Sequence, residues 1–195
     1  MAERPEEVYV RNLFDQRFGV RLRKVPEAAT KTPDYELIGD GEAVAVLEVK
    51  AIKPVAHTPE NGWTKTALGF WTRVDNSPQR VANDIHKACK QLHASALPKI
   101  LTFVNEDGLD VMDLEDAFHG GLYYGNQTSG YYFNSASGQR GAVKRIADEK
   151  NKIDLFIWVD RYGGLAHDPQ CRFVTEVGCE VARRWFGVPE TPRHG

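Results

Sequence analysis

The spacing of apolar residues divides the chain into helices and strands. Val10, Phe14 and Phe18 recur at helical spacing before Gly19, which is typical of a helix that ends at a glycine. Ser77, followed by proline, is a good N-cap for a second helix. Helices are predicted over residues 5–18, 77–96 and 180–186, and strands over 20–25, from about 35, and over 43–52, 99–104, 153–159 and 172–177. This order predicts an α/β protein.

Length and charge narrow the class of protein. The chain has 195 residues, of which 42% are hydrophobic, so we expect one domain over residues 1–195 with one sizeable core. A net charge of −2 argues against a disordered chain or a broadly basic coat for nucleic acid. Basic residues do gather over 11–31 and 140–152, where they either meet phosphates or form ordinary solvated faces. The longest apolar run has 5 residues, which predicts a cytoplasmic protein without membrane contact.

Several kinds of site are excluded by their spacing. Cys89, Cys171 and Cys179 show no CxxC pair, which suits reduced thiols better than a disulfide framework or a zinc ribbon. His167 does not complete a standard zinc spacing with the last two of these cysteines. The chain also has no Walker A loop, GxGxxG motif or nucleophile elbow.

Two ionised residues interrupt the apolar strand predicted over 43–52. Glu48 and Lys50 stand two positions apart, so their side chains point to the same face of the strand, while Val49 points to the other. A carboxylate beside an ammonium group on a buried strand favours a site. The alternative is an exposed ion pair on an edge strand.

A third ionised residue, Asp34, lies at the start of the preceding strand. A tight hairpin turn over 39–41 puts Asp34 roughly opposite Val46, so a bulge or bend is needed to bring it to Glu48. Two carboxylates with a strand carbonyl can bind Mg²⁺, which polarises a phosphoryl oxygen and lowers the pKa of a bound water. Lys50 would then position or activate that water.

These residues resemble the motif of the PD-(D/E)XK nuclease superfamily. Pro33-Asp34 matches its first half and Glu48-Val49-Lys50 its second, with 13 residues between the two acids. The predicted order is similar to the family core of a helix, a three-strand meander, a crossover helix and a further strand. The resemblance covers roughly residues 5–105, with 106–195 as a C-terminal β/α extension. It implies a restriction-endonuclease-like fold, in which helices flank a central mixed sheet.

The resemblance also implies a chemistry and a partner. It implies a Mg²⁺-dependent nuclease, with Mn²⁺ as a substitute, that hydrolyses phosphodiester bonds in DNA in preference to RNA. Asp34 and Glu48 would be the metal ligands, and Lys50 the water-orienting base or electrostatic stabiliser.

Two further site residues are expected from the same resemblance. Many members carry an acid on the first helix, and Glu7 suits this role better than Glu6 because it leads the apolar face of that helix. Otherwise Glu7 stabilises the helix through the macrodipole. Many members also place a Lys or Gln on the crossover helix near the catalytic acids, and Gln91 is the expected residue here. Otherwise Gln91 is a polar residue on a solvated face.

Two aromatic segments could shape the substrate. Residues 54–76 lack clear periodicity and contain Trp63 and Trp71, which either stack on unpaired bases or cap the core. Residues 120–141 are rich in Gly and Tyr and predict a hairpin, which is either a lid that shapes the substrate or a structural or homodimer-forming hairpin.

Three functions therefore remain open. The first is the metal-dependent nuclease. The second is a catalytically silent, nuclease-like module that binds nucleic acid or a partner protein. The third is an ordinary α/β protein in which the motif arises by chance, and it requires Asp34 to lie far from Glu48 in the structure.

Overall fold

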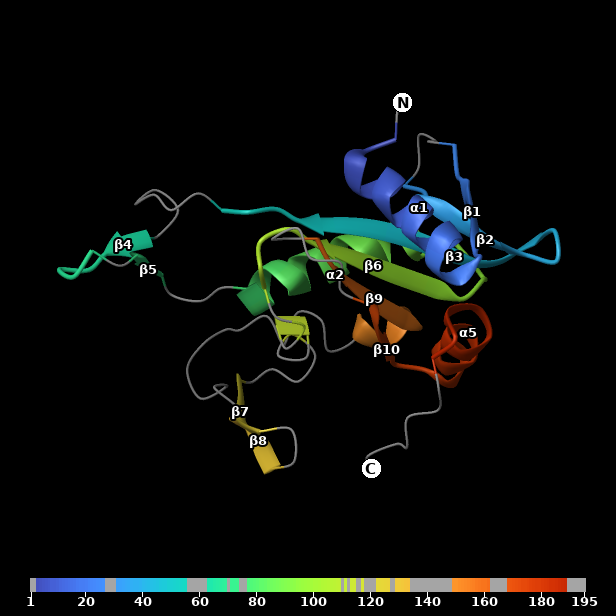
Figure 1. Ribbon diagram of the computed structural model, residues 1–195. Coiled ribbons are helices and arrows are strands. Elements are labelled where there is room, and N and C mark those ends of the chain that lie inside the picture. The colour runs from blue at the N-terminus through green and yellow to red at the C-terminus, as the bar shows by residue number, and fades with distance from the viewer. Residues whose placement is uncertain are drawn as a thin grey trace.

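A six-stranded mixed sheet with three packed helices forms the centre of the molecule (Figure 1). The computed structural model describes residues 3–26, 31–55, 63–69, 71–73, 77–109, 111, 113–114, 117, 122–126, 129–133, 149–161 and 168–188. The helices are α1 (Pro5–Phe18), α2 (Ser77–Leu92) and α5 (Glu176–Phe186). The strands of the sheet, in spatial order, are β1 (Arg21–Lys24), β2 (Tyr35–Gly39), β3 (Glu42–Ile52), β6 (Lys99–Asn105), β9 (Leu155–Asp160) and β10 (Gln170–Phe173). The expectation of an α/β fold is confirmed.

The central strands are parallel and the outer ones antiparallel. β3, β6 and β9 run in the same direction, while β1, β2 and β10 pair antiparallel to their neighbours. β6 and β9 are buried almost throughout, as parallel strands covered on both faces should be. β3 therefore lies inside the sheet, with β2 on one side and β6 on the other.

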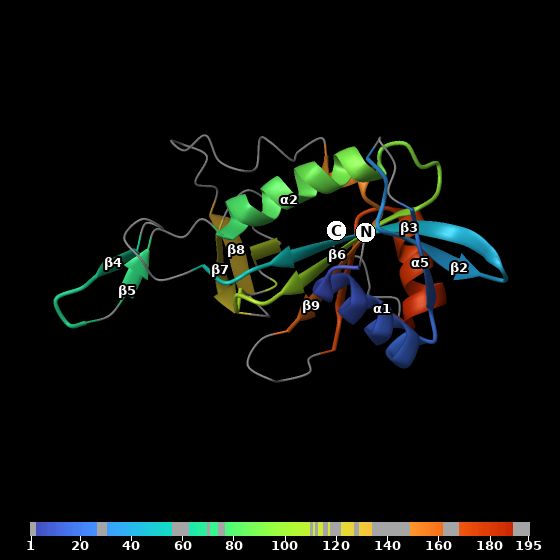
Figure 2. The ribbon, with the colours of Figure 1, turned by 90° about the horizontal axis from the view of Figure 1, so that it is seen from above.

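Helices cover both faces of this sheet, so two apolar layers are buried. α2 lies on one side, and α1 and α5 lie on the other (Figure 2). Ile85 and Leu92 of α2 pack with Val46 of β3 in the first layer. Phe14 of α1 packs with Leu47 of β3 in the second. Because β3 alternates between these layers, Glu48 and Lys50 share the face that α2 covers.

The hairpin between β2 and β3 contains the bulge that the sequence required. Asp40 and the glycine after it form a two-residue turn with φ angles of 54° and 89°, as in a type I′ hairpin. The pairing register then shifts between Leu37 and Ile38. Tyr35 consequently pairs with Leu47, and the same register one residue further places Asp34 opposite Glu48.

The C-terminal part of the chain extends the same sheet. Asp154 joins three elements, because its side chain accepts hydrogen bonds from the Lys99 amide at 2.8 Å and the Thr175 hydroxyl at 2.7 Å. Thr175 also caps α5 by accepting from the Gly178 amide at 3.0 Å. With Thr175 as N-cap, α5 begins at Glu176, and β10 ends before the cap at Phe173. The strand and helix predicted here are both present, but the predicted strand end at 177 and helix start at 180 were wrong.

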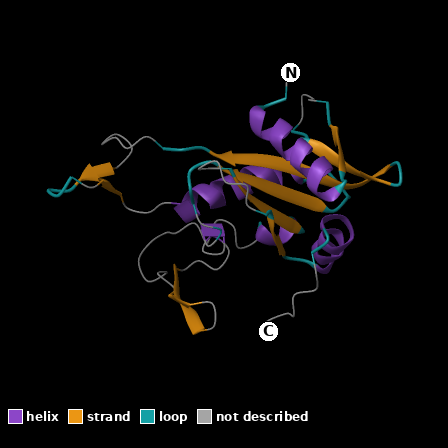
Figure 3. Cartoon of the chain, in the orientation of Figure 1, coloured by secondary structure: helices purple, strands orange, loops and turns teal. Residues whose placement is uncertain are grey.

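Two boundaries elsewhere also differ from prediction. α2 ends at Leu92 rather than near residue 96, because the chain turns there and then enters β6. Within 54–76, where a loop without regular structure was expected, β4 (Trp63–Lys65) and β5 (Trp71–Arg73) form a hairpin that projects from the sheet (Figure 3). The side chains of Trp63 and Trp71 lie outside the described part of the chain, so both of their predicted roles remain predictions.

The hairpin predicted over 120–141 is present as β7 (Leu122–Asn126) paired with β8 (Ser129–Phe133). Its side chains also lie outside the described part, so a lid and a dimer contact both stay predictions. None of the described helices is long and apolar enough to span a membrane.

A glycine at the start of α5 tests how the C-terminal elements are joined. In Gly178→Ala, the added methyl group would overlap the backbone carbonyl of Asp154. We expect a loss of about 1–3 kcal/mol in the free energy of unfolding, measured by urea denaturation. Glu180→Ala, at an exposed position of the same helix, is the control and should change little. Equal stability of the two variants would contradict the close contact.

Candidate active site

Asp34 is bound to the strand that carries the rest of the motif. Its Oδ2 accepts a hydrogen bond from the Val49 amide at 2.8 Å, and its side chain is 11% exposed. The carboxylate is therefore held beside β3 at the level of Glu48. This contact brings Asp34 close to Glu48, whereas a chance coincidence of motifs predicts that the two residues lie far apart.

Glu48 is a fully buried acid with incomplete hydrogen bonding. Its side chain is 0% exposed, and Oε1 accepts a hydrogen bond from Lys50 Nζ at 2.6 Å. Oε2 has no hydrogen-bond partner among the residues that the structure describes. Buried carboxylate oxygens are costly without partners, so this oxygen needs an explanation.

Lys50 links the strand to the helix above it. Its ammonium group donates to Glu48 and, also at 2.6 Å, to Oε1 of Gln91 on α2. The side chain of Lys50 is only 13% exposed, so these two hydrogen bonds fix the position of its ammonium group. The structure thus brings together three of the predicted residues, and Gln91 is not on a solvated face.

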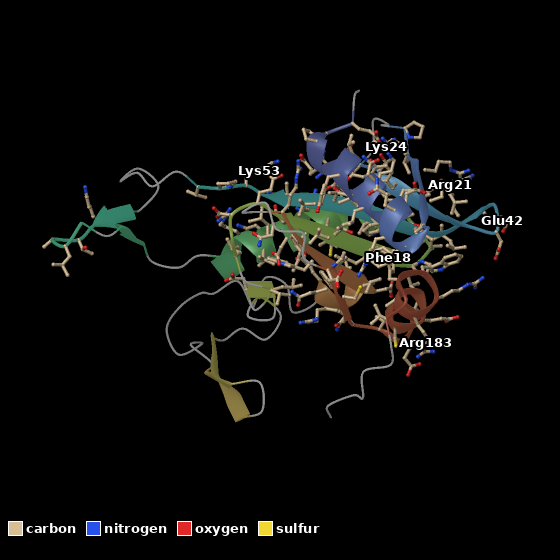
Figure 4. The ribbon with its side chains drawn as sticks, viewed as in Figure 1. Phe18, Arg21, Lys24, Glu42, Lys53 and Arg183 are labelled. Carbon is tan, nitrogen blue, oxygen red and sulfur yellow. The ribbon has the colours of Figure 1, made fainter. Side chains whose placement is uncertain are left out.

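Glu7 joins Asp34 through two shared cations. Arg4 donates from Nε to Glu7 at 2.6 Å and from Nη2 to Asp34 at 3.0 Å. Lys24 Nζ lies 2.8 Å from Glu7 Oε2 and 3.7 Å from Asp34 Oδ1. Arg4 also approaches the Val49 carbonyl oxygen, at 3.4 Å. Figure 4 shows Lys24 beside α1, at this end of the cluster.

Sequence reasoning missed Arg4 and Lys24 as members of the site. Lys24 carried a usable signal, because the predicted strand over 20–25 precedes the strand of Asp34 in a meander. Arg4 carried none, since it precedes the helix and the contact with Asp34 depends on how α1 packs.

Glu6, the other candidate helix acid, touches this cluster only through Arg4, whose Nη1 lies 3.9 Å from Glu6 Oε1, and otherwise pairs with Lys53. Its Oε2 lies 3.4 Å from Lys53 Nζ, and Lys53 also pairs with Glu106 at 2.9 Å. Lys53 follows the end of β3 and is labelled in Figure 4. Among the described ion pairs, Glu7 thus shares both Arg4 and Lys24 with Asp34, whereas Glu6 shares only Arg4.

Burial controls the protonation of the acids. Burial, with the nearby charge of Asp34, raises the pKa of Glu48 to about 7 against the opposing effect of Lys50. Burial also raises the pKa of Asp34, although the Val49 amide and Arg4 favour its charged form. For Glu7, burial is outweighed by hydrogen bonds from Lys24 and Arg4, which lower its pKa to about 2.

The basic residues over 11–31 are largely engaged with acids. This finding favours charge-balanced surface faces over a bare phosphate-binding surface for that segment. The ion pairs in it are Arg11–Glu3, Arg17–Asp168, Arg23–Glu36 and Lys24–Glu7. Most of the second basic group, over 140–152, lies outside the described residues.

Oxygen atoms in the site fit a hard divalent cation. The carboxylates of Asp34 and Glu48 and the Val49 carbonyl oxygen are the donor types that Mg²⁺ prefers. A bound cation would also give Oε2 of Glu48, which has no partner among the described residues, an interaction partner. In the described part of the chain, no three His, Cys, Asp or Glu side chains form a metal-binding group. Glu7 therefore does not complete a three-carboxylate set in this arrangement. A site with two carboxylates still suits Mg²⁺, which keeps several waters.

The raised pKa of Glu48 makes stability depend on pH. Below about pH 4.5 Glu48 is protonated in both states, and between that value and about 7 the folded protein keeps a proton that the unfolded chain releases. Stability without metal should therefore decrease as pH rises from about 4.5 to about 7, and this group should cause no further change above that range. Glu48→Gln should flatten this decrease, whereas the exposed control Glu180→Gln should not. Urea unfolding over about pH 4–8 measures the slopes, and equal slopes for wild type and Glu48→Gln would contradict the raised pKa.

Comparison with known proteins identifies no relative. No protein-family model matches the chain, and neither a curated protein nor a solved structure was found to match it. The resemblance to the PD-(D/E)XK superfamily therefore depends on Pro33-Asp34, on Glu48-Val49-Lys50 and on the elements around them. The function proposed below for this site is therefore inferred from its chemistry and geometry.

Proposed function

We propose that this protein is a Mg²⁺-dependent nuclease with a restriction-endonuclease-like core, and that DNA is preferred over RNA. The observation that carries the proposal is the buried carboxylate of Glu48, which accepts a hydrogen bond from Lys50, is close enough to Asp34 to feel its charge, and has one oxygen without a partner among the described residues. A buried acid in this state destabilises the fold, which argues for a function.

The arrangement of elements supports the same proposal. α1, the meander β1–β2–β3, the crossover helix α2 and the parallel strand β6 follow the order that the resemblance implies. The motif residues lie where β2 begins and within the second half of β3, and α2 contributes Gln91 from above. Two carboxylates, a lysine and a glutamine thus converge from three elements.

Each residue has a distinct task in this proposal. Asp34, Glu48 and the Val49 carbonyl would hold Mg²⁺, which supplies Lewis-acid polarisation of a phosphodiester when bound. Lys50 places its Nζ where it can orient the attacking water and stabilise the negative charge that develops on the phosphate. Gln91 accepts a hydrogen bond from Nζ and so fixes the direction of the lysine.

One observation favours the silent binding module instead. Arg4 already contacts Asp34 and the Val49 carbonyl, so an internal cation partly neutralises the oxygens that a metal would need. The two functions differ in plasmid cleavage. Binding of nucleic acid without cleavage under any divalent cation would favour the silent module.

Removal of one carboxylate tests the metal site. Asp34→Asn keeps a side-chain oxygen for the Val49 amide but removes the charge. We expect Mn²⁺ affinity to fall by more than the roughly 10- to 100-fold that loss of an outer-shell partner costs. Asp40→Asn is the matched control, since Asp40 is an 87% exposed acid on the same hairpin. Calorimetric titration measures both, and unchanged affinity in Asp34→Asn would remove Asp34 from the site.

Substitution of the lysine separates metal binding from catalysis. Lys50→Met has a similar length and no charge, so Mn²⁺ binding should survive while cleavage falls by roughly 10²- to 10⁴-fold. Lys87→Met, on an exposed lysine of α2 paired with Asp84, should cleave normally. The readouts are plasmid cleavage and Mn²⁺ calorimetry. Full cleavage by Lys50→Met would end the proposed role of this residue.

A further inference from the structure

Arg4 contacts the same oxygens that the proposed metal would use. Its Nη2 lies 3.0 Å from Asp34 Oδ2 and 3.4 Å from the Val49 carbonyl oxygen. A guanidinium group and a divalent cation cannot share these positions, because both are positive and both need the oxygen lone pairs. Occupation by Arg4 and occupation by a metal are therefore alternatives.

The other contacts of Arg4 would persist if its outer nitrogen moved away from Asp34 and Val49. Its Nε donates to Glu7 Oε1 at 2.6 Å, its backbone amide donates to Glu7 Oε2 at 3.1 Å, and its Nη1 lies 3.9 Å from Glu6 Oε1. None of these contacts involves Asp34 or Val49. The side chain is 44% exposed, so its outer nitrogen can turn toward solvent while Glu7 keeps hold of the inner one.

A cation beside Asp34 stabilises the protein when no metal is bound. Asp34 and Glu7 are 11% and 4% exposed, and Glu48 is completely buried nearby. Acids this close repel each other and lose hydration, which destabilises the fold unless positive charge compensates them. Arg4 and Lys24 supply that charge, and Arg4 is the one that reaches both prospective ligands.

We propose that Arg4 is an exchangeable counter-ion of this site, which stabilises the acids in the metal-free protein and gives way to a divalent cation. The proposal rests on the proposed function, because it assumes that Asp34 and the Val49 carbonyl bind metal. Glu7 then has a defined task as the residue that retains Arg4 in both states. Metal affinity is set by competition with Arg4 and is weaker than the oxygens alone would give.

The test compares metal binding with stability in two matched variants. Arg4→Gln removes the charge and keeps part of the side-chain stem. Arg11→Gln is the control, because Arg11 lies on α1, is 42% exposed and pairs with Glu3 at 2.9 Å rather than with Asp34. The full chain is titrated with Mn²⁺ by calorimetry, and its thermal unfolding is measured without metal and at saturating Mn²⁺.

We expect Arg4→Gln to bind Mn²⁺ about tenfold more tightly than wild type, as loss of one competing charge-assisted hydrogen bond implies. Its melting temperature should be below that of wild type without metal and equal to it at saturating Mn²⁺. Arg11→Gln should keep wild-type affinity. Arg4→Lys, which retains charge and is the safer variant for folding, should bind Mn²⁺ with an affinity between those of wild type and Arg4→Gln.

Other outcomes would overturn the exchange. Equal Mn²⁺ affinity in wild type and Arg4→Gln, with the same loss of stability in both states, would make Arg4 a purely structural residue and leave the metal site intact. Absence of Mn²⁺ binding in both wild type and Arg4→Gln would overturn the metal site and the exchange together. Binding by Arg4→Gln alone would support the exchange in its strongest form.

Discussion

The hydrogen bond from the Val49 amide to Asp34 determines the geometry of the whole site. It joins the residue before β2 to the strand β3, and it forms because the pairing register shifts between Leu37 and Ile38. Without this bulge, the two-residue turn would place Asp34 one position away from Glu48, and the alternating pleat would turn its side chain to the other face. The position of the Asp34 carboxylate relative to that of Glu48 thus depends on one bulge in the hairpin.

Charge compensation is the second constraint on this region. Asp34, Glu7 and Glu48 lose most of their hydration, and each has at least one basic side chain nearby. The compensation is uneven, since Glu7 has a pKa lowered to about 2 and Glu48 has one raised to about 7. These opposite shifts indicate that the fold stabilises the charge of Glu7 and tolerates that of Glu48. Such divergence is common where carboxylates have different tasks.

The rest of the fold gives these residues a rigid support. The parallel pairing of β3 with β6 places α2 across the face of Glu48 and Lys50, so that Gln91 reaches the ammonium group. The strands β9 and β10, with α5, continue the sheet from the far side and are tied to β6 through Asp154. The C-terminal half therefore belongs to the same packed structure that holds the site, although it contributes none of the described motif residues.

The sequence by itself determined the local part of this arrangement. The apolar period predicted α1, β3 and β6, and the two-residue spacing of Glu48 and Lys50 placed them on one face, because side-chain direction in a strand follows from position alone. Gln91 on α2 was expected from the family resemblance rather than from spacing. The tertiary structure decided the rest: which residue bulges, that Thr175 starts a helix, and that Arg4 contacts Asp34, 30 residues away. These features depend on how separate elements pack and on which long-range partners satisfy buried charge, and neither is encoded in the spacing of residues along one element.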